Sequence, residues 1–156
     1  FQISNVFLSS KIPDFNILIE QRQWNELNKL FLNAFLKTII LFSLGIGAFY
    51  IVFYFYYDSL QILQRLVSPF ALIILFFGWL LQNIINGLAI YLRAFKEEPL
   101  YLASMFNSVF TVGATLFLVN NMNYDFVFCG FLTGNMLMLP YVYYLFRKKR
   151  NIQFNF

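Results

Sequence analysis

The chain has 156 residues, of which 60% are hydrophobic and only 12% are charged, and its net charge is +4. It has no histidine and one cysteine, which excludes a histidine-based metal or catalytic site and a disulfide-stapled secreted module. An ordinary soluble domain is roughly a quarter charged, so this chain has too little polar material to cover a soluble surface. The composition predicts an all-α, polytopic membrane helix bundle, in which lipid solvates the apolar faces.

The first segment, residues 1–10, is apolar with polar interruptions and is too short to span a bilayer. We expect it to be the end of a truncated transmembrane helix. The first residue is Phe1 rather than a methionine, and we therefore expect the chain to be a piece of a longer protein. Pro13 ends this segment, because a proline disfavours helical geometry in the residue before it.

Residues 11–37 mix charged and apolar side chains, with Trp24, Leu27, Phe31 and Phe35 at helical spacing. This pattern predicts an amphipathic linker that lies in the membrane interface. A helix on the solvent side, packed against the rest of the protein, is the alternative.

Four long runs without a charged residue follow, and each is long enough to cross a hydrocarbon core of about 30 Å at about 1.5 Å per residue. The connectors between them are short, so neighbouring spans are expected to be antiparallel. The sequence therefore predicts four complete transmembrane helices after a partial one and a cytoplasmic linker. The four runs are 38–57, 67–92, 100–119 and 126–146.

Basic residues are concentrated on alternate connectors, which is the pattern that the positive-inside rule describes. The linker, the second connector and the basic tail at 147–156 are therefore predicted to be cytoplasmic, and the connectors at 58–66 and 120–125 to face outside. The RKKR run in the tail is more typical of a topology anchor than of a nucleic-acid site, and it can also contact anionic lipid head groups. Ten basic residues fall on the predicted inner side, and only Arg65 on the other: Lys11, Arg22, Lys29, Lys37, Arg93, Lys96, Arg147, Lys148, Lys149 and Arg150.

The second run carries the main group of polar side chains, which includes Gln82, Asn83 and Asn86. Gln82 and Asn86 are four residues apart and share a helix face with Arg93. Such a face can line a cavity and bind sugar hydroxyls or phosphate, although amides more commonly join membrane helices to each other. We take Lys37, Gln82, Asn86 and Arg93 as the candidate substrate-binding residues.

Small and hydroxyl residues in the last two runs are typical of close helix packing. The third run has a stripe at steps of four, three and four, and the fourth has Gly130 and Gly134 in a G-x-x-x-G pattern. No combination of nucleophile and base, phosphate-binding loop or metal-ligand spacing is present in the sequence. We therefore expect neither an enzyme nor a bound metal or cofactor. The hydroxyl stripe consists of Ser104, Ser108, Thr111 and Thr115.

Three stretches resemble a known family in their order and spacing. These are PDFNILIEQRQWNELNKLFLNAF at 13–35, YLRAFKEEP at 91–99, and the ending from Pro140 through Lys149. They resemble the linker, a late connector and the C-terminus of polysaccharide-biosynthesis flippases, which handle O-antigen and capsule precursors in the multidrug/oligosaccharidyl-lipid/polysaccharide exporter superfamily.

The resemblance implies a C-terminal piece of a two-lobed transporter in the cytoplasmic (inner) membrane, with its own C-terminus cytoplasmic. Its activity would be the translocation of an undecaprenyl-pyrophosphate-linked oligosaccharide by alternating access, for lipopolysaccharide or capsule synthesis. The implied partners are membrane lipids, the lipid-linked oligosaccharide and the missing N-terminal part of the same protein, with no nucleic acid. The alternatives are a drug or metabolite exporter of the same superfamily, a non-transporting membrane scaffold and a fragment of a glycan polymerase.

Overall fold

The computed structural model describes residues 2–57, 68–95, 100–122 and 124–154. Within these ranges every regular element is helical, which confirms the predicted all-α class. The connector expected at 58–66 and residues 96–99 of the next connector lie outside the described residues. The elements in chain order are α1 (Gln2–Ser9), α2 (Ile12–Glu20), α3 (Trp24–Tyr57), α5 (Pro69–Arg93), α6 (Tyr101–Asn121), the 3₁₀ helix η1 (Tyr124–Phe126) and α7 (Cys129–Phe154).

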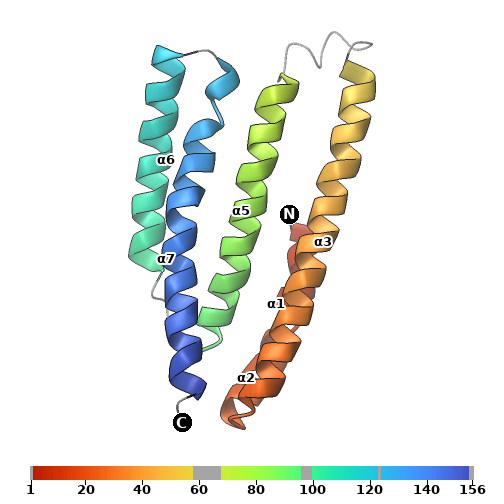
Figure 1. The fold of residues 1–156 in the computed structure, drawn as a ribbon, viewed down its shortest axis with the longest axis vertical. Helices are drawn as coiled ribbons and strands as arrows, with labels where there is room; N and C mark the ends of the chain where they lie inside the picture. Colours follow the sequence, from red (N-terminus) through yellow and green to blue (C-terminus); the bar gives the residue numbers. More distant parts are fainter. Residues whose placement is uncertain (1, 58–67, 96–99, 123, 155–156) are drawn as a thin grey trace.

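The four long helices lie side by side in one layer, in the spatial order α6, α7, α5 and α3 (Figure 1). Consecutive long helices run in opposite directions, as short connectors require. Helices α1 and α2 pack against one half of α3, and α1 also contacts α5. That half of the bundle also holds the C-terminus (Figure 1), and we call it the basic half. It contains the nine basic residues that the structure describes, namely the eleven of the chain less those at 65 and 96.

Three of the described helices, α3, α5 and α6, are long and apolar enough to cross a membrane. No side chain of α6 is fully buried, and Phe106 is 75% exposed, as expected where lipid is the neighbour. The fourth predicted span, 126–146, lies mostly within α7, which is not one of the three. The mean hydropathy of α7 is lower because the helix includes the basic run at 147–150, in addition to Asn135, Pro140 and several tyrosines.

The segment predicted to be a linker, 11–37, is divided between two helices. Helix α2 ends before Arg22, whose φ of 56° is in the left-handed region and turns the chain. Helix α3 then continues without interruption, so residues 24–37 belong to the same helix as the first predicted span. The hydropathy changes near residue 38, but the helix persists because Leu27 and Phe31 keep one of its faces buried.

An aromatic cluster holds the basic half together. The ring of Phe31 on α3 lies 4.7 Å from that of Tyr91 on α5 and 5.7 Å from that of Phe146 on α7. Tyr91 and Phe146 are themselves 4.9 Å apart, and Phe15 on α2 meets the edge of Phe31 at 6.2 Å. Since Phe15, Phe31 and Tyr91 are at most 1% exposed, the cluster fixes four helices relative to one another.

Helices α6 and α7 pack through small residues. A Cβ atom at Gly130 would lie 2.6 Å from the backbone nitrogen of Thr115 and 3.0 Å from the carbonyl oxygen of Thr111. A Cβ atom at Gly134 would lie 2.9 Å from Oδ1 of Asn107. The G-x-x-x-G pattern of α7 therefore faces part of the hydroxyl stripe of α6, and the packing interpretation of both patterns is confirmed there.

At the opposite end of the bundle, Ser68 caps α5. Its hydroxyl oxygen accepts a hydrogen bond from the backbone N–H of Ala71 at 3.2 Å, and its O–H donates to the carboxylate of Asp125 in η1. This pair ties the start of α5 to the connection between α6 and α7.

Candidate functional site

The four residues predicted to bind substrate lie on two helices. Lys37 is exposed on α3, Gln82 and Asn86 are half-buried on α5, and Arg93 is exposed at the last residue of α5. Lys37 lines a groove between α1 and α3. None of the grooves described below has Gln82, Asn86 or Arg93 in its lining, so the structure does not bring the four residues into one cavity among them.

Two other amide side chains, one on α5 and one on α7, are deeply buried. Asn83 is 1% exposed and Asn135 is 0% exposed. Nδ2 of Asn135 donates to the carbonyl oxygen of Gly78 at 3.0 Å, which joins α7 to α5. Neither Nδ2 nor Oδ1 of Asn83 has a hydrogen-bond partner among the described residues. Asn135 is therefore an amide that joins two helices. The sequence pattern alone could not distinguish it from Asn83 in this respect.

A groove of about 420 Å³ between α1 and α3, which we call the lysine groove, contains Lys11, Lys29 and Lys37. Glu26 is the single acidic residue in its described lining, so the lining carries three positive charges and one negative charge. Lys11 is also paired with Asp14 at 2.9 Å, but both side chains are nearly half exposed and such pairs contribute little to stability. The lysine groove can therefore attract an anionic lipid head group.

A second groove, of about 540 Å³, lies between α3 and α7 with α5 beneath it, and we call it the arginine groove. Its polar residues all come from the last turns of α7, while α3 and α5 contribute only apolar side chains. The groove therefore has one cationic rim and an apolar floor. Its lining consists of Phe31, Leu32 and Phe35 of α3, Ile84 and Leu88 of α5, and Tyr143, Phe146, Arg147, Arg150 and Asn151 of α7.

The chemistry of the arginine groove suits a ligand that joins an anionic group to an apolar chain. A guanidinium group binds phosphate oxygens through two parallel N–H donors, which an ammonium group cannot do. An aliphatic chain lying along the floor would pack against Phe35 and Leu88. There it would be shielded from water or take the place of membrane lipid. The volume falls within the range of about 300–1000 Å³ that small-molecule sites occupy.

The four basic residues of the RKKR run differ in position because the run is helical. Arg147 and Arg150 are three residues apart and share the face of α7 that lines the groove. Lys148 is exposed and lies outside the groove lining, and the Nζ atom of Lys149 lies 5.2 Å from the ring centroid of Phe95. Only the two arginines therefore reach the site.

The sequence pattern assigns residues 147–156 to a basic tail whose RKKR run anchors topology and can contact lipid head groups, and it gives the two arginines no role in substrate binding. The missed signal is helical periodicity that continues beyond the fourth apolar run, since α7 extends to Phe154. Tyr143, Arg147 and Arg150 follow one another at steps of four and three, which places them on one face.

The described residues contain no group of three His, Cys, Asp or Glu side chains placed to hold a metal ion. Comparison of the chain with protein-family models, with curated proteins and with solved structures finds no match in any of the three.

Proposed function

We propose that the chain is part of a transporter that moves a lipid-linked oligosaccharide, of the undecaprenyl-pyrophosphate type, across the cytoplasmic membrane by alternating access. The observation that carries the proposal is the arginine groove, which sets Arg147 and Arg150 beside an apolar floor. A polyprenyl diphosphate has this same combination of a doubly charged head and a long apolar chain. The sequence resemblance to polysaccharide-biosynthesis flippases supports the same substrate class.

The proposed membrane placement includes α7 as a fourth span, with the basic half at the cytoplasmic face. An excess of lysine and arginine on one side is what orients membrane helices. In this orientation the arginine groove and the lysine groove lie at the leaflet from which the substrate is taken. Arg147 and Arg150 would hold the diphosphate, and Lys37 would add positive charge at the same membrane level.

The polar face of α5 has a separate role in the proposal. Gln82 and Asn86 would bind sugar hydroxyls, and Arg93 would bind a charged group of the glycan or lipid. Rocking of this bundle against the remainder of the protein would then expose the bound substrate to the other leaflet. Membrane lipids and the remaining part of the same protein are therefore the proposed partners.

The test removes charge from the groove and, in a matched control, the same charge from beside it. The gene is deleted and restored in full-length form with either Arg147→Gln/Arg150→Gln or Lys148→Gln/Lys149→Gln. Both double variants remove two positive charges from the tail, so they perturb topology equally. We expect the arginine pair to reduce surface glycan and to leave lipid-linked repeat units on the cytoplasmic leaflet, while the lysine pair restores export.

Equal export from the two double variants would contradict a role for the arginine groove. Normal surface glycan in the deletion strain would contradict the substrate class itself. Increased sensitivity of that strain to toxic small molecules, with normal glycan, would favour the exporter alternative.

A further inference from the structure

The lysine groove has properties that an ordinary basic surface lacks. Any cluster of basic residues beside a membrane attracts anionic lipid in general, whereas a binding site for one lipid also needs walls and a defined charge. Apolar side chains, among them Phe7 of α1 and Leu30 of α3, stand between the lysines of this groove. Lys11 comes from the junction of α1 and α2, while Lys29 and Lys37 come from α3, so the positive charge converges from separate helices.

The charge of the lysine groove matches a single phosphodiester. Asp14 is paired with Lys11 at 2.9 Å, and Glu26 contributes a second carboxylate to the lining. Neither Lys29 nor Lys37 takes part in an ion pair within the described residues. Three lysines and two carboxylates leave one net positive charge, which one phosphodiester balances. A zwitterionic lipid would bring another positive group into the groove, where it would be repelled.

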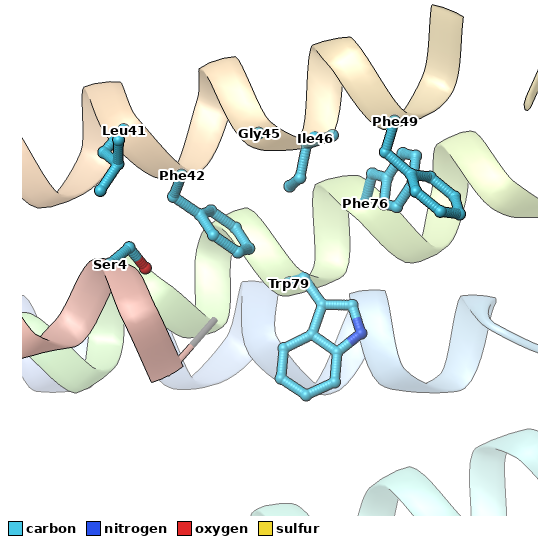
Figure 2. A pocket seen from close by; sticks show the side chains of 8 residues that line it. All are labelled: Ser4, Leu41, Phe42, Gly45, Ile46, Phe49, Phe76 and Trp79. Atoms are coloured by element: carbon cyan, nitrogen blue, oxygen red, sulfur yellow. The ribbon is translucent and has the colours of Figure 1, made fainter. Parts of the chain in front are cut away.

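The surroundings of α3 change from charged to apolar within about one helical turn, which locates the level of the lipid head groups. Lys37 is the last α3 residue in the lysine groove. Leu41, four residues later, lines a groove of about 500 Å³ between α3 and α5, whose lining has no charged residue (Figure 2). Lys29 lies about 12 Å from Lys37 along the helix axis, on the side away from the apolar run. The lysines therefore extend from the edge of the hydrocarbon core into the head-group region.

Beyond Lys37, the same face of α3 is apolar and exposed. Leu44 and Ile51 follow Lys37 at steps of seven residues, which keeps the three side chains on one face of the helix. Leu44 is 66% exposed and Ile51 is 56% exposed, so no described helix covers them fully. A lipid whose phosphate lies at Lys37 can therefore lay an acyl chain along this face without displacing another helix.

The uncharged polar residues of the lysine groove suit a head group that carries hydroxyls. The amide of Asn33 can both donate and accept hydrogen bonds, while the carboxylate of Glu26 accepts only. The hydroxyl of Ser10 donates to the carbonyl oxygen of Phe7 at 3.3 Å, and its oxygen can still accept. The hydroxyl groups of a glycerol head group can donate to these oxygens and accept from the amide.

We propose that the lysine groove binds one anionic phospholipid that has a single phosphodiester and a hydroxyl-bearing head group, as phosphatidylglycerol does. The bound lipid links the junction of α1 and α2 to α3 through its phosphate. This inference goes beyond the proposed function: it requires α3 to cross the membrane, but neither the oligosaccharide substrate nor transport activity.

Lipid retention by the full-length protein tests the proposal. The protein is reconstituted with equal amounts of phosphatidylglycerol and phosphatidylethanolamine and extracted in mild detergent, and the lipid that remains bound is measured by native mass spectrometry. We expect one phosphatidylglycerol to be retained preferentially. Lys29→Gln/Lys37→Gln should weaken this binding by about fivefold for each lysine removed. Lys29→Arg/Lys37→Arg keeps both charges and should keep the lipid.

Two further variants separate a site from general attraction. Lys148→Gln/Lys149→Gln removes the same charge outside the lysine groove, and Arg147→Gln/Arg150→Gln removes it from the arginine groove. Both variants should retain phosphatidylglycerol as the unmodified protein does. Equal loss from all three glutamine variants, or loss from the arginine variant alone, would overturn the proposal.

Two outcomes with the unmodified protein would also overturn it. Equal retention of the two lipids would remove the head-group preference, and displacement by an excess of free glycerol phosphate would show that the acyl chains are not needed. Because the readout is bound phospholipid, the proposal can succeed even if the lipid-linked oligosaccharide proves to be the wrong substrate.

Discussion

Two buried asparagines show how much the partner of a polar side chain matters inside the bundle. Nδ2 of Asn135 donates to the carbonyl oxygen of Gly78, whereas its Oδ1 and both polar atoms of Asn83 are without a partner among the described residues. A buried polar group without a partner loses its hydration and gains nothing in return. The same chemical change should therefore be more favourable at Asn83, which makes no hydrogen bond, than at Asn135, which makes one.

We predict that Asn83→Leu leaves the protein more stable than Asn135→Leu does. Loss of the hydrogen bond between α7 and α5 should cost about 0.6 kcal/mol, the average for such bonds in membrane proteins. Replacement of the unpaired amide of Asn83 should raise the free energy of unfolding by about 1 kcal/mol, because an apolar side chain has no desolvation penalty. Thermal unfolding of the whole protein in detergent, with both variants measured side by side, provides the comparison. A loss in Asn83→Leu as large as that in Asn135→Leu would mean that Asn83 has a polar partner in the complete protein.

At the scale of the elements, the contact between α6 and α7 depends on glycines that cannot be enlarged. The neighbours of a Cβ at Gly130 include the side-chain hydroxyl of Thr115, but also the backbone nitrogen of Thr115 and the carbonyl oxygen of Thr111, which cannot rotate away as a side chain could. Gly113 also lies on α6, but a Cβ there would meet nothing within 4 Å.

We predict that Gly130→Ala weakens the α6–α7 contact by about 1–3 kcal/mol, the usual cost of overpacking. Gly113→Ala should instead leave stability unchanged or raise it by up to about 1 kcal/mol, because alanine is the better helix former. Chemical or thermal unfolding of the two variants in the same detergent measures both effects. Equal stability of the two variants would mean that α6 and α7 are further apart than the structure places them.

The ends of α5 and α6 follow closely from the sequence, because the apolar runs at 67–92 and 100–119 stop where charged or turn-forming residues begin. The start of α3 does not follow from the same signal. Hydropathy reports which solvent surrounds a segment, whereas helix continuity depends on local propensity and on one buried face. Residues 24–37 change their surroundings but retain that face, so the helix crosses the expected boundary near residue 38.

At the scale of the whole molecule, the candidate site is formed by helices that are distant in the sequence. Helices α3 and α7 flank α5, so one groove is lined by residues of all three helices, among them Phe35, Leu88 and Arg147. Periodicity indicates which face of each helix is polar or apolar, but not which faces meet. This is why the sequence could supply Lys37 and the polar face of α5 as candidates, while the arginine groove required the three-dimensional arrangement.

The gathering of charge in one half of the molecule also predicts its orientation. All nine described basic residues lie in the half that holds α2 and the C-terminus, and Met122, which follows α6, lies at the opposite end. Since basic segments remain on the cytoplasmic side, that half should face the cytoplasm. We therefore expect a membrane-impermeant maleimide to label Met122→Cys in intact cells and Lys148→Cys only after the cytoplasmic membrane is permeabilised.

Both substitutions are made in a Cys129→Ala background, so that the chain's own cysteine does not react. The side chains of Met122 and Lys148, which the new cysteines replace, are both exposed. If the chain crossed the membrane an even number of times between residues 122 and 148, both positions would lie on the same side of the membrane. The two cysteines would then be labelled under the same conditions. The prediction therefore tests orientation and the proposed fourth span at once, because α7 is the helix that separates Met122 from Lys148. Labelling of Lys148→Cys alone in intact cells would reverse the orientation but keep the span, whereas equal labelling would remove α7 from the membrane.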